Sequence, residues 1–341
     1  MFKQLLGQVA QGKSLTREEA REAMRLIMDG EAHPTQIASF LTALRMKGET
    51  VDEIIGFVET MRKKAVSLET KGEELLDTCG TGGDGGISFN ISTAAAIVAA
   101  AGGARVAKHG NRAVSSKSGS ADVLEALGVT ITSSSKEAIR CLEETNLCFL
   151  FAPQYHQAMK HAVEPRRQLG FRTVFNLLGP LTNPACAERQ LLGIYDRNLG
   201  VKVAEVLVEL GVKRALVVAG ADGLDEISIS GFTYVVEVDC GMISPYTIHP
   251  EMFGLSVHPL ENVAGGDAVE NARIIRRVFD GEKGAYRDIV VLNTAAAFYV
   301  GGQVASIGEG VRLAQEMIDI GEAKRKLEQL VEVTGGVSHA S

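Results

Sequence analysis

From Leu75 onward, the chain alternates short apolar runs with longer stretches of helical periodicity. After a first run at Leu75 and Leu76, the segments with the length and composition of strands are 105–107, 148–151, 191–195, 215–219 and 234–238. Strands that alternate with helices are usually parallel, because each helix carries the chain back along one face of the sheet. The pattern therefore predicts an α/β domain with a mostly parallel central sheet covered by helices.

The first 70 residues carry helix signals only. Capping boxes, in which a Thr stands three residues before a Glu, open helices after Thr16 and Thr50, and Pro34 opens another between them. We predict a small all-helical domain at residues 1–70 and a large α/β domain at residues 71–341, which can lend a helix or two to the small one. Three short helices make a thin core, so we also expect this end to pair with a second copy, giving a homodimer.

A glycine-rich loop follows the first predicted strand, and five of the eight residues 79–86 are glycine. Such a loop can point several backbone N–H groups at one anion, although a flexible surface turn is the alternative for the loop alone. Ser92 and Thr93 follow at the expected N-cap of a helix whose dipole points back at the loop. The spacing matches neither a Walker loop nor a dinucleotide fingerprint, so we expect a different phosphate site.

A basic cluster follows the strand predicted at 105–107. Lys108 supplies a point charge, His109 an imidazole and Arg112 a fork of N–H donors, all at the carboxyl end of a strand, where ligands bind in such sheets. A solvated basic turn is the alternative. The helix that starts at Ser120 offers one more N-terminal contact to an anion.

Asp225 and Glu226 lie in a loop between two predicted strands. Adjacent carboxylates are ligands that Mg²⁺ accepts together with phosphate oxygens and water. A solvated turn is the alternative for this pair when it is considered alone.

Two arginines follow a predicted helix at 155–164, which we expect to break at Pro165. Arg166 is a candidate partner for a planar carboxylate, because a guanidinium donates two parallel hydrogen bonds. An ordinary surface arginine is the alternative. The apolar segment 176–184 is expected to form a wall or hinge beside the site.

Composition limits the classes of partner. The 341 residues have a formal net charge of −7, which argues against general binding to nucleic acid or to an anionic membrane. The five cysteines are odd in number and widely spaced, which is typical of reduced thiols, and no apolar run has the roughly 20 residues of a membrane span. We therefore expect a cytoplasmic enzyme with a small anionic substrate.

Taken together, these motifs resemble the anthranilate phosphoribosyltransferase family over almost the whole chain. Five motifs stand in the family's order and approximate spacing: Gly80-Thr81-Gly82-Gly83-Asp84, Asn90-Ile91-Ser92-Thr93, Lys108-His109-Gly110-Asn111-Arg112, Asn176 to Pro184 and Asp225-Glu226. Two positions differ: Ser88 keeps a hydroxyl within an altered loop, and Ala113 stands where Ser is commoner.

The resemblance implies the fold of pyrimidine nucleoside phosphorylases and phosphoribosyltransferases, a homodimer, and the use of phosphoribosyl pyrophosphate and Mg²⁺. By position, it implies that phosphoribosyl pyrophosphate is bound by Gly80, Gly83, Asp84, Ser88, Asn90, Ile91, Ser92, Thr93, Lys108, Ser116 and Ser120. It further implies magnesium ligands at Ser92, Asp225 and Glu226, and anthranilate contacts at Gly80, Asn111 and Arg166. Catalytic roles are expected for Lys108, His109 and Asn111.

The implied reaction transfers the phosphoribosyl group to the amine of anthranilate and releases pyrophosphate, a step of tryptophan biosynthesis. An aromatic amine is neutral at pH 7, so catalysis is expected to rest on positioning and on charge stabilisation at the leaving group. His109 is a candidate acceptor for the amine proton. Two alternatives stay open: a pyrimidine nucleoside phosphorylase, and a nucleic-acid-binding relative of the same fold that has no enzymatic activity.

Overall fold

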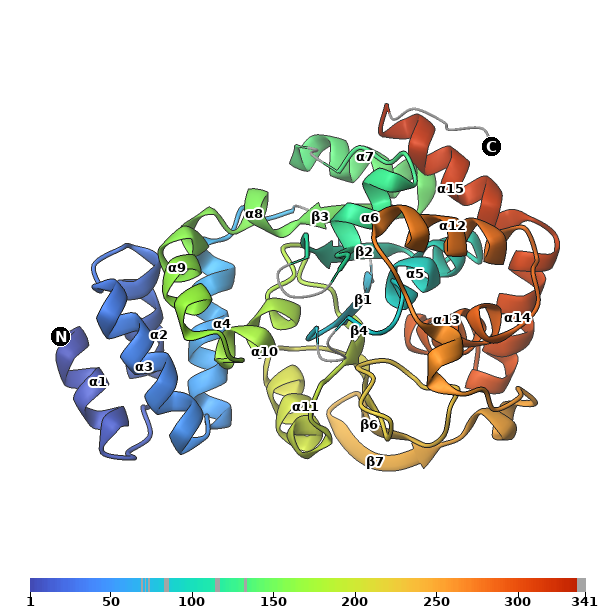
Figure 1. Cartoon of the computed structure of the whole chain (residues 1–341). Helices are drawn as coiled ribbons and strands as arrows, with labels where there is room; N and C mark the ends of the chain where they lie inside the picture. Colours follow the sequence, from blue (N-terminus) through green and yellow to red (C-terminus); the bar gives the residue numbers. More distant parts are fainter. Residues whose placement is uncertain are drawn as a thin grey trace.

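The computed structural model describes residues 1–68, 70, 72, 74–82, 86–113, 117–131 and 134–335. The helical N-terminal segment lies to one side of a larger α/β body in Figure 1. Its helices begin where the sequence predicts, with the side chains of Thr16 and Thr50 as N-caps, and a further helix precedes them. Their bounds are α1 (Phe2–Ala10), α2 (Arg17–Met28), α3 (Pro34–Lys47) and α4 (Val51–Lys64).

The described residues of the larger body form a seven-stranded sheet in the order β3-β2-β1-β4-β5-β6-β7. The strands β1 to β5 are parallel, and β6 and β7 are antiparallel, which confirms a mostly parallel sheet. The sequence did not predict β7, because this edge strand is largely exposed and contains Pro245. The bounds are β1 (Leu76–Gly80), β2 (Val106–Gly110), β3 (Leu147–Phe151), β4 (Arg189–Gly193), β5 (Arg214–Gly220), β6 (Thr233–Asp239) and β7 (Met242–Ile248).

Helices cover both faces of this sheet (Figure 1). One face packs against α5 (Ile91–Ala101) and α13 (Ala285–Gly301), with α12 (Ala268–Phe279), α14 (Ile307–Asp319) and α15 (Glu322–Val333) outside them. The other face packs against α10 (Val174–Leu181) and α11 (Gly200–Glu209). The remaining helices are α6 (Ser120–Ala126), α7 (Ser135–Thr145), α8 (Ala152–Tyr155) and α9 (Lys160–Leu169), with short 3-10 turns η1 (Gln157–Met159), η2 (Arg197–Leu199), η3 (Pro250–Phe253) and η4 (Leu260–Val263).

Strand alternation divides the apolar residues of the sheet among separate cores, two of which meet at β5. In β5, Leu216 and Val218 face the α5 and α13 side, whereas Ala215 and Val217 face the α10 and α11 side. The second core continues without a break into α1 to α4. The helical segment is therefore fixed to the sheet by shared apolar packing, which sets the walls of the cleft between them.

One local prediction was wrong. The helix expected to break at Pro165 instead runs through it, because α9 begins only at Lys160 and packing of the buried proline outweighs the loss of one N–H donor. The segment 176–184 does form a wall of the cavity, as expected, but most of it is the helix α10. Both α9 and α10 pack on the N-terminal helices. The division of the chain into two domains between 70 and 71 stays a prediction.

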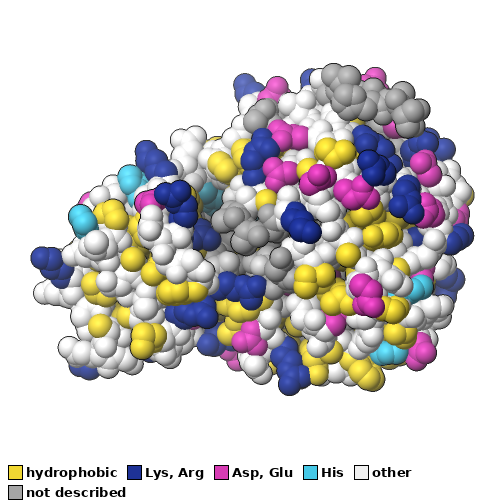
Figure 2. All heavy atoms as spheres, viewed as in Figure 1, with side chains coloured by type: hydrophobic (Ala, Val, Ile, Leu, Met, Phe, Trp, Pro, Cys, Tyr) yellow, Lys and Arg dark blue, Asp and Glu magenta, His cyan; other side chains and the backbone are white. Residues whose placement is uncertain are grey.

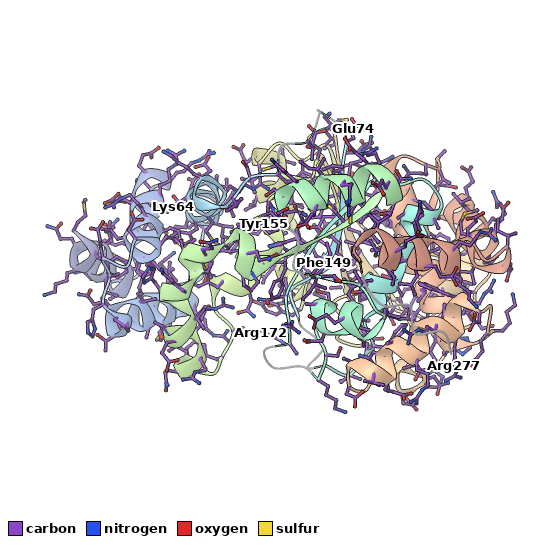
Figure 3. All side chains as sticks on the ribbon, turned by 90° about the horizontal axis from the view of Figure 1, so that it is seen from above. Lys64, Glu74, Phe149, Tyr155, Arg172 and Arg277 are labelled. Carbon is purple, nitrogen blue, oxygen red and sulfur yellow. The ribbon has the colours of Figure 1, made fainter. Side chains whose placement is uncertain are left out.

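Viewed from above, the chain passes from β3 near Phe149 through Tyr155 toward the N-terminal helices (Figure 3). Figure 2 shows acidic and basic side chains mixed over the visible face, with Lys and Arg side chains gathered near the junction of the two parts. All five cysteines lie among the described residues, and none forms a disulfide, as predicted. No described helix has the length and apolar character needed to cross a membrane.

Candidate active site

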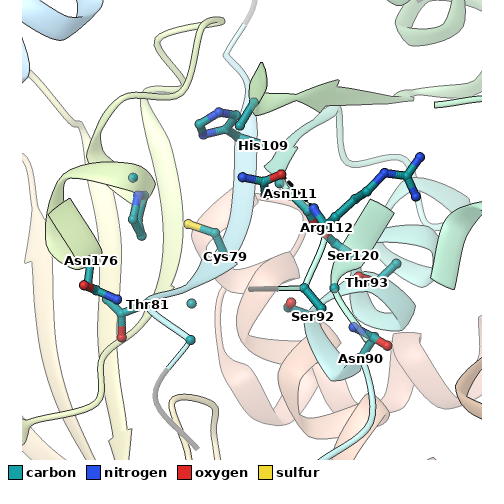
Figure 4. Close-up of a pocket in the computed structure, with 18 of the residues that line it drawn as sticks. Cys79, Thr81, Asn90, Ser92, Thr93, His109, Asn111, Arg112, Ser120 and Asn176 are labelled. Carbon is teal, nitrogen blue, oxygen red and sulfur yellow. Dashed lines mark hydrogen bonds between the residues drawn. The ribbon is translucent and has the colours of Figure 1, made fainter. Parts of the chain in front are cut away.

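A cavity of about 620 Å³ lies at the carboxyl ends of β1 and β2, between the sheet and the helices α4, α9 and α10. The predicted site residues that the structure describes all line it: Gly80, Ser88, Asn90, Ile91, Ser92, Thr93, Lys108, His109, Asn111, Ser120, Arg166, Asp225 and Glu226. Several of them converge on one space from different elements in Figure 4. Gly83, Asp84 and Ser116 lie outside the described residues.

The helix α5 begins earlier than the sequence predicts. Its N-cap is Asn90 rather than Ser92 or Thr93, so these two residues lie in the first turn, where their backbone N–H groups face the cavity end of the helix. The N–H of Ser92 donates to Glu226 Oε1 at 3.2 Å. The hydroxyl of Thr93 is buried and has no hydrogen-bond partner among the described residues. Both features favour an anion at this helix terminus.

The acidic pair reaches the site because residues 221–232, the connection between β5 and β6, fold back over the ends of β4 and β1. Gly80 and Gly193 are directly paired on these two strands, and they leave room for Asp225. A Cβ on Gly193 would lie 1.6 Å from the Asp225 carbonyl oxygen, and one on Gly80 would lie 2.5 Å from Asp225 Oδ2. The two glycines therefore form a seat for the acidic pair, and any side chain there would displace it.

The predicted magnesium ligands lie together. Asp225 is buried, its Oδ2 accepts a hydrogen bond from the Gly82 N–H at 2.8 Å, and Glu226 is linked to Ser92 as described above. The described residues contain no group of three or more His, Cys, Asp or Glu side chains that could hold a metal. This donor set fits a Mg²⁺ that takes most of its ligands from phosphate oxygens and water, and it does not fit a metal held by protein alone.

Lys108 lies beneath the site rather than in its open part. Its side chain is buried, and Nζ donates to the Thr78 carbonyl and, at 3.3 Å, to Ser92 Oγ. Burial lowers the pKa of Lys108, and the buried carboxylate of Asp77 opposes that shift. Lys108 thus joins the end of β1 to the first turn of α5 and brings a positive charge close to both.

His109 has a buried imidazole. Its pKa is lowered to about 3 by burial, by neighbouring His156 and by Lys108, while a hydrogen bond with the Gly179 backbone opposes the shift. The rings of His109 and His156 have centroids 5.2 Å apart, and His109 Nε2 has no partner among the described residues. The imidazole is therefore neutral at pH 7.

The predicted basic cluster begins within β2, which contains Lys108 and His109, while Asn111 and Arg112 follow the strand. The Asn111 carbonyl accepts from the Ser120 hydroxyl at 3.3 Å, which joins the strand end to the start of α6. Against expectation, the fork of Arg112 is not directed at the anion site: its guanidinium binds both carboxylate oxygens of Glu125, and also Asp122. These acidic partners hold Arg112 at the outer edge of the cavity.

Arg166 enters the cavity from α9. Its guanidinium lies over the ring of Phe175, 5.1 Å from the centroid, and burial lowers its pKa. No described carboxylate forms an ion pair with it, whereas the neighbouring Arg167 pairs with Glu164 at 2.8 Å. Arg166 is thus a partly buried cation, beside an aromatic face, that suits an aromatic carboxylate.

Sequence reasoning missed several residues of the site. Met61, Phe175 and His156 line the cavity from the helical side, where only a helical pattern was visible in the sequence. Asn271 of α12 donates from Nδ2 to Asn90 Oδ1 at 2.9 Å. Nothing near Asn271 marks it as functional, because its contact crosses 181 positions of sequence.

Comparison with known proteins agrees with this geometry. Residues 3–65 match the family model of the glycosyl transferase helical bundle domain, and residues 72–324 match that of the glycosyl transferase a/b domain. The chain is 59% identical to the anthranilate phosphoribosyltransferase of Brevibacillus brevis over 341 residues, which is the full length of both chains. It is 53% identical to that of Acetivibrio thermocellus, over 98% of this chain and 97% of the relative.

The chain belongs to the anthranilate phosphoribosyltransferase family. Solved structures of the family have the same fold. That of anthranilate phosphoribosyltransferase from Thermus thermophilus gives a TM-score of 0.92 at 45% identity, covering 97% of this chain and 99% of the other. The Saccharomyces cerevisiae enzyme in complex with PRPP and Mg gives a TM-score of 0.89 at 30% identity, covering 98% of each chain.

Proposed function

We propose that this chain transfers the phosphoribosyl group of phosphoribosyl pyrophosphate to the amine of anthranilate, giving N-(5-phosphoribosyl)anthranilate and pyrophosphate in tryptophan biosynthesis. The observation that carries the proposal is the convergence on one cavity of an acidic pair, a helix N-terminus and an arginine with no ion pair to a described carboxylate. Full-length identity of 59% to a named anthranilate phosphoribosyltransferase supports the substrates. The solved yeast relative, described with PRPP and Mg, supports the metal.

The two substrates are assigned to opposite ends of the cavity. Gly82, just after β1, and the first turn of α5 suit the phosphate groups, because both present backbone N–H donors. Asn90 Nδ2 donates to the Ser118 carbonyl, so Ser118, just before α6, is held close to this end. Anthranilate is assigned to the helical side, with its carboxylate at Arg166 and its ring near Phe175.

Asp225 and Glu226, with Ser92, are the residues that would hold Mg²⁺. When bound, the metal supplies positive charge to the oxygens of the leaving pyrophosphate. In this structure, Asp225 and Glu226 accept the N–H groups of Gly82 and Ser92. We propose that these N–H groups would become available to substrate phosphates if the two carboxylates held the metal.

The chemistry needs no strong base. The amine of anthranilate is neutral at pH 7 and attacks with its own lone pair, while Lys108 supports the charge that develops at the leaving group. A pKa of about 3 makes His109 a poor general base near neutral pH, since an effective base has a pKa near the working pH. We therefore assign His109 a positioning role beside the amine, and the proton is lost to solvent.

A direct assay tests the proposal. Anthranilate fluorescence should fall when the protein is mixed with anthranilate, phosphoribosyl pyrophosphate and Mg²⁺, and EDTA should prevent the loss. A parallel cuvette with thymidine and phosphate tests the phosphorylase alternative. Consumption of anthranilate without thymine release supports the transferase; thymine release alone would refute it.

We further propose that the enzyme is cytoplasmic and a homodimer through the N-terminal helices. The free thiols support the first proposal. The thin core expected of the short N-terminal helices supports the second proposal, and a partner on this segment would cover apolar side chains such as Met46 of α3, which is 83% exposed. Light scattering after size exclusion tests the dimer, because a monomeric mass at micromolar concentration would contradict it.

A further inference from the structure

We propose that Asn293 of α13 is a positioning residue that sets the affinity of the site for metal-bound phosphoribosyl pyrophosphate. Asn293 does not line the cavity and touches neither proposed substrate site. It acts through Ile227, the residue that follows the acidic pair Asp225-Glu226. The inference rests on the metal site proposed above.

The contact is a two-point clamp on one backbone residue. The amide oxygen of Asn293 accepts the Ile227 N–H at 2.9 Å, and Asn293 Nδ2 donates to the Ile227 carbonyl at 2.9 Å. Nδ2 also donates to the Ile289 carbonyl at 2.9 Å, one turn earlier on α13. If the amide were reversed, its NH₂ group would face the Ile227 N–H and its oxygen would face the Ile227 carbonyl. The orientation of the Asn293 amide therefore follows from its hydrogen-bond partners.

The clamp is buried, and its bonds are therefore hard to replace. Asn293 and Ile227 are both 0% exposed, so water cannot take over the N–H and carbonyl of Ile227 if the amide is removed. The acidic pair itself has a different environment, because Asp225 and Glu226 line the cavity. Asn293 thus connects the largely buried helix α13 to the backbone beside two carboxylates that have to meet a cation.

A second contact fixes the other side of the same segment. The exposed residue Asp222 accepts hydrogen bonds from the hydroxyls of Ser228 and Ser230 and from the Leu224 N–H. This closes residues 222–230 into a loop around the acidic pair. Asn293 holds that loop from the core and Asp222 holds it at the surface, while Gly193 forms its seat.

The test compares Asn293→Ala with Thr294→Val. Thr294 is the next residue on α13, is also 0% exposed, and its hydroxyl has no hydrogen-bond partner among the described residues, so its replacement controls for changes in the buried helix. Calorimetry measures binding of phosphoribosyl pyrophosphate with Mg²⁺ and with EDTA, and thermal melting is recorded for each variant. We expect Asn293→Ala to weaken binding at least about tenfold with Mg²⁺ and less than about twofold with EDTA.

Each result decides the matter. Equal loss of affinity with and without Mg²⁺, wild-type affinity in Asn293→Ala, or the same loss in Thr294→Val would overturn the inference. If Asn293→Ala does not fold, Asp222→Ala at the exposed side of the loop should show the same Mg²⁺-specific loss, and its absence there would overturn it as well. A wild-type protein that binds phosphoribosyl pyrophosphate equally well in EDTA would instead refute the metal site on which the inference rests.

Discussion

Replacing Gly193 by Ala tests how closely the acidic pair is fitted to the sheet. The added Cβ would lie 1.6 Å from the Asp225 carbonyl oxygen, 2.5 Å from its carbonyl carbon and 3.3 Å from its Cα. Real Cβ contacts essentially never fall below 3.0 Å. The distance between the new Cβ and the Asp225 carbonyl oxygen therefore has to grow by at least 1.4 Å, from 1.6 Å to 3.0 Å. The atoms in the way are backbone, and no rotation of a side chain can relieve the clash.

The displacement should affect catalysis strongly. A misplacement of about 1 Å in a catalytic group can cost roughly 100-fold in rate, so we expect kcat/KM of Gly193→Ala to fall by about 100-fold or more. Asn293 holds Ile227, two residues after Asp225, in place, so the segment that carries Asp225 cannot simply shift as a rigid body. The loss should appear mainly with Mg²⁺ and phosphoribosyl pyrophosphate, while the KM for anthranilate should change little.

The assay is the loss of anthranilate fluorescence at several Mg²⁺ concentrations, with thermal melting to verify folding. Gly231→Ala is the matched control, because Gly231 lies in the same connection between β5 and β6 and a Cβ there would meet nothing within 4 Å. We expect Gly231→Ala to keep wild-type kinetics. A folded Gly193→Ala protein with wild-type kcat/KM would refute the reasoning about the glycine seat.

Other substitutions at the same site give three more expected outcomes. Arg166→Ala should raise the KM for anthranilate by about 10- to 100-fold and the KM for phosphoribosyl pyrophosphate by less than about threefold. The control Arg167→Ala, which removes an exposed neighbour, should change neither KM. Equal effects of Arg166→Ala on both substrates would exclude its role in binding the carboxylate. Asp225→Asn combined with Glu226→Gln should raise the Mg²⁺ concentration for half-maximal activity at least about tenfold. An unchanged Mg²⁺ requirement would show that neither residue is a metal ligand. The pKa of His109 is about 3 in the folded protein and about 6.5 when unfolded, so the unfolded chain binds the extra proton and stability declines as the pH falls below about 6.5. His109→Gln should therefore lose less stability than wild type between pH 7 and pH 5, by up to about 2 kcal/mol in urea denaturation, and equal losses would contradict the buried neutral imidazole.

The sequence predicted the strands and the N-terminal helices because their signals are local. Capping boxes at Thr16 and Thr50 fixed helix starts to the residue, and apolar runs marked every strand that is buried on both faces. The edge strand β7 was not predicted, because an exposed strand lacks the run of apolar residues that marks a buried one. The break predicted at Pro165 is absent, because tertiary packing overrides the local helix-breaking tendency of proline.

The site was predictable where its residues stand in short motifs at strand ends. Asp225 was found in this way, yet its seat on Gly193 depends on a connection that crosses from β5 over β4, which no periodicity records. The direction of the Arg112 side chain was missed for a similar reason, since its partner Glu125 lies on the following helix and competes with any ligand. Long-range contacts such as that of Asn293 with Ile227 have no signature in sequence.

The most direct test of the proposed site is a crystal structure with phosphoribosyl pyrophosphate and Mn²⁺, in which anomalous scattering locates the metal. We predict a peak within bonding distance of the carboxylates of Asp225 and Glu226, and pyrophosphate oxygens between this metal and the first turn of α5. A metal bound elsewhere, with Asp225 still bonded to the Gly82 N–H and Glu226 to the Ser92 N–H, would contradict the assignment.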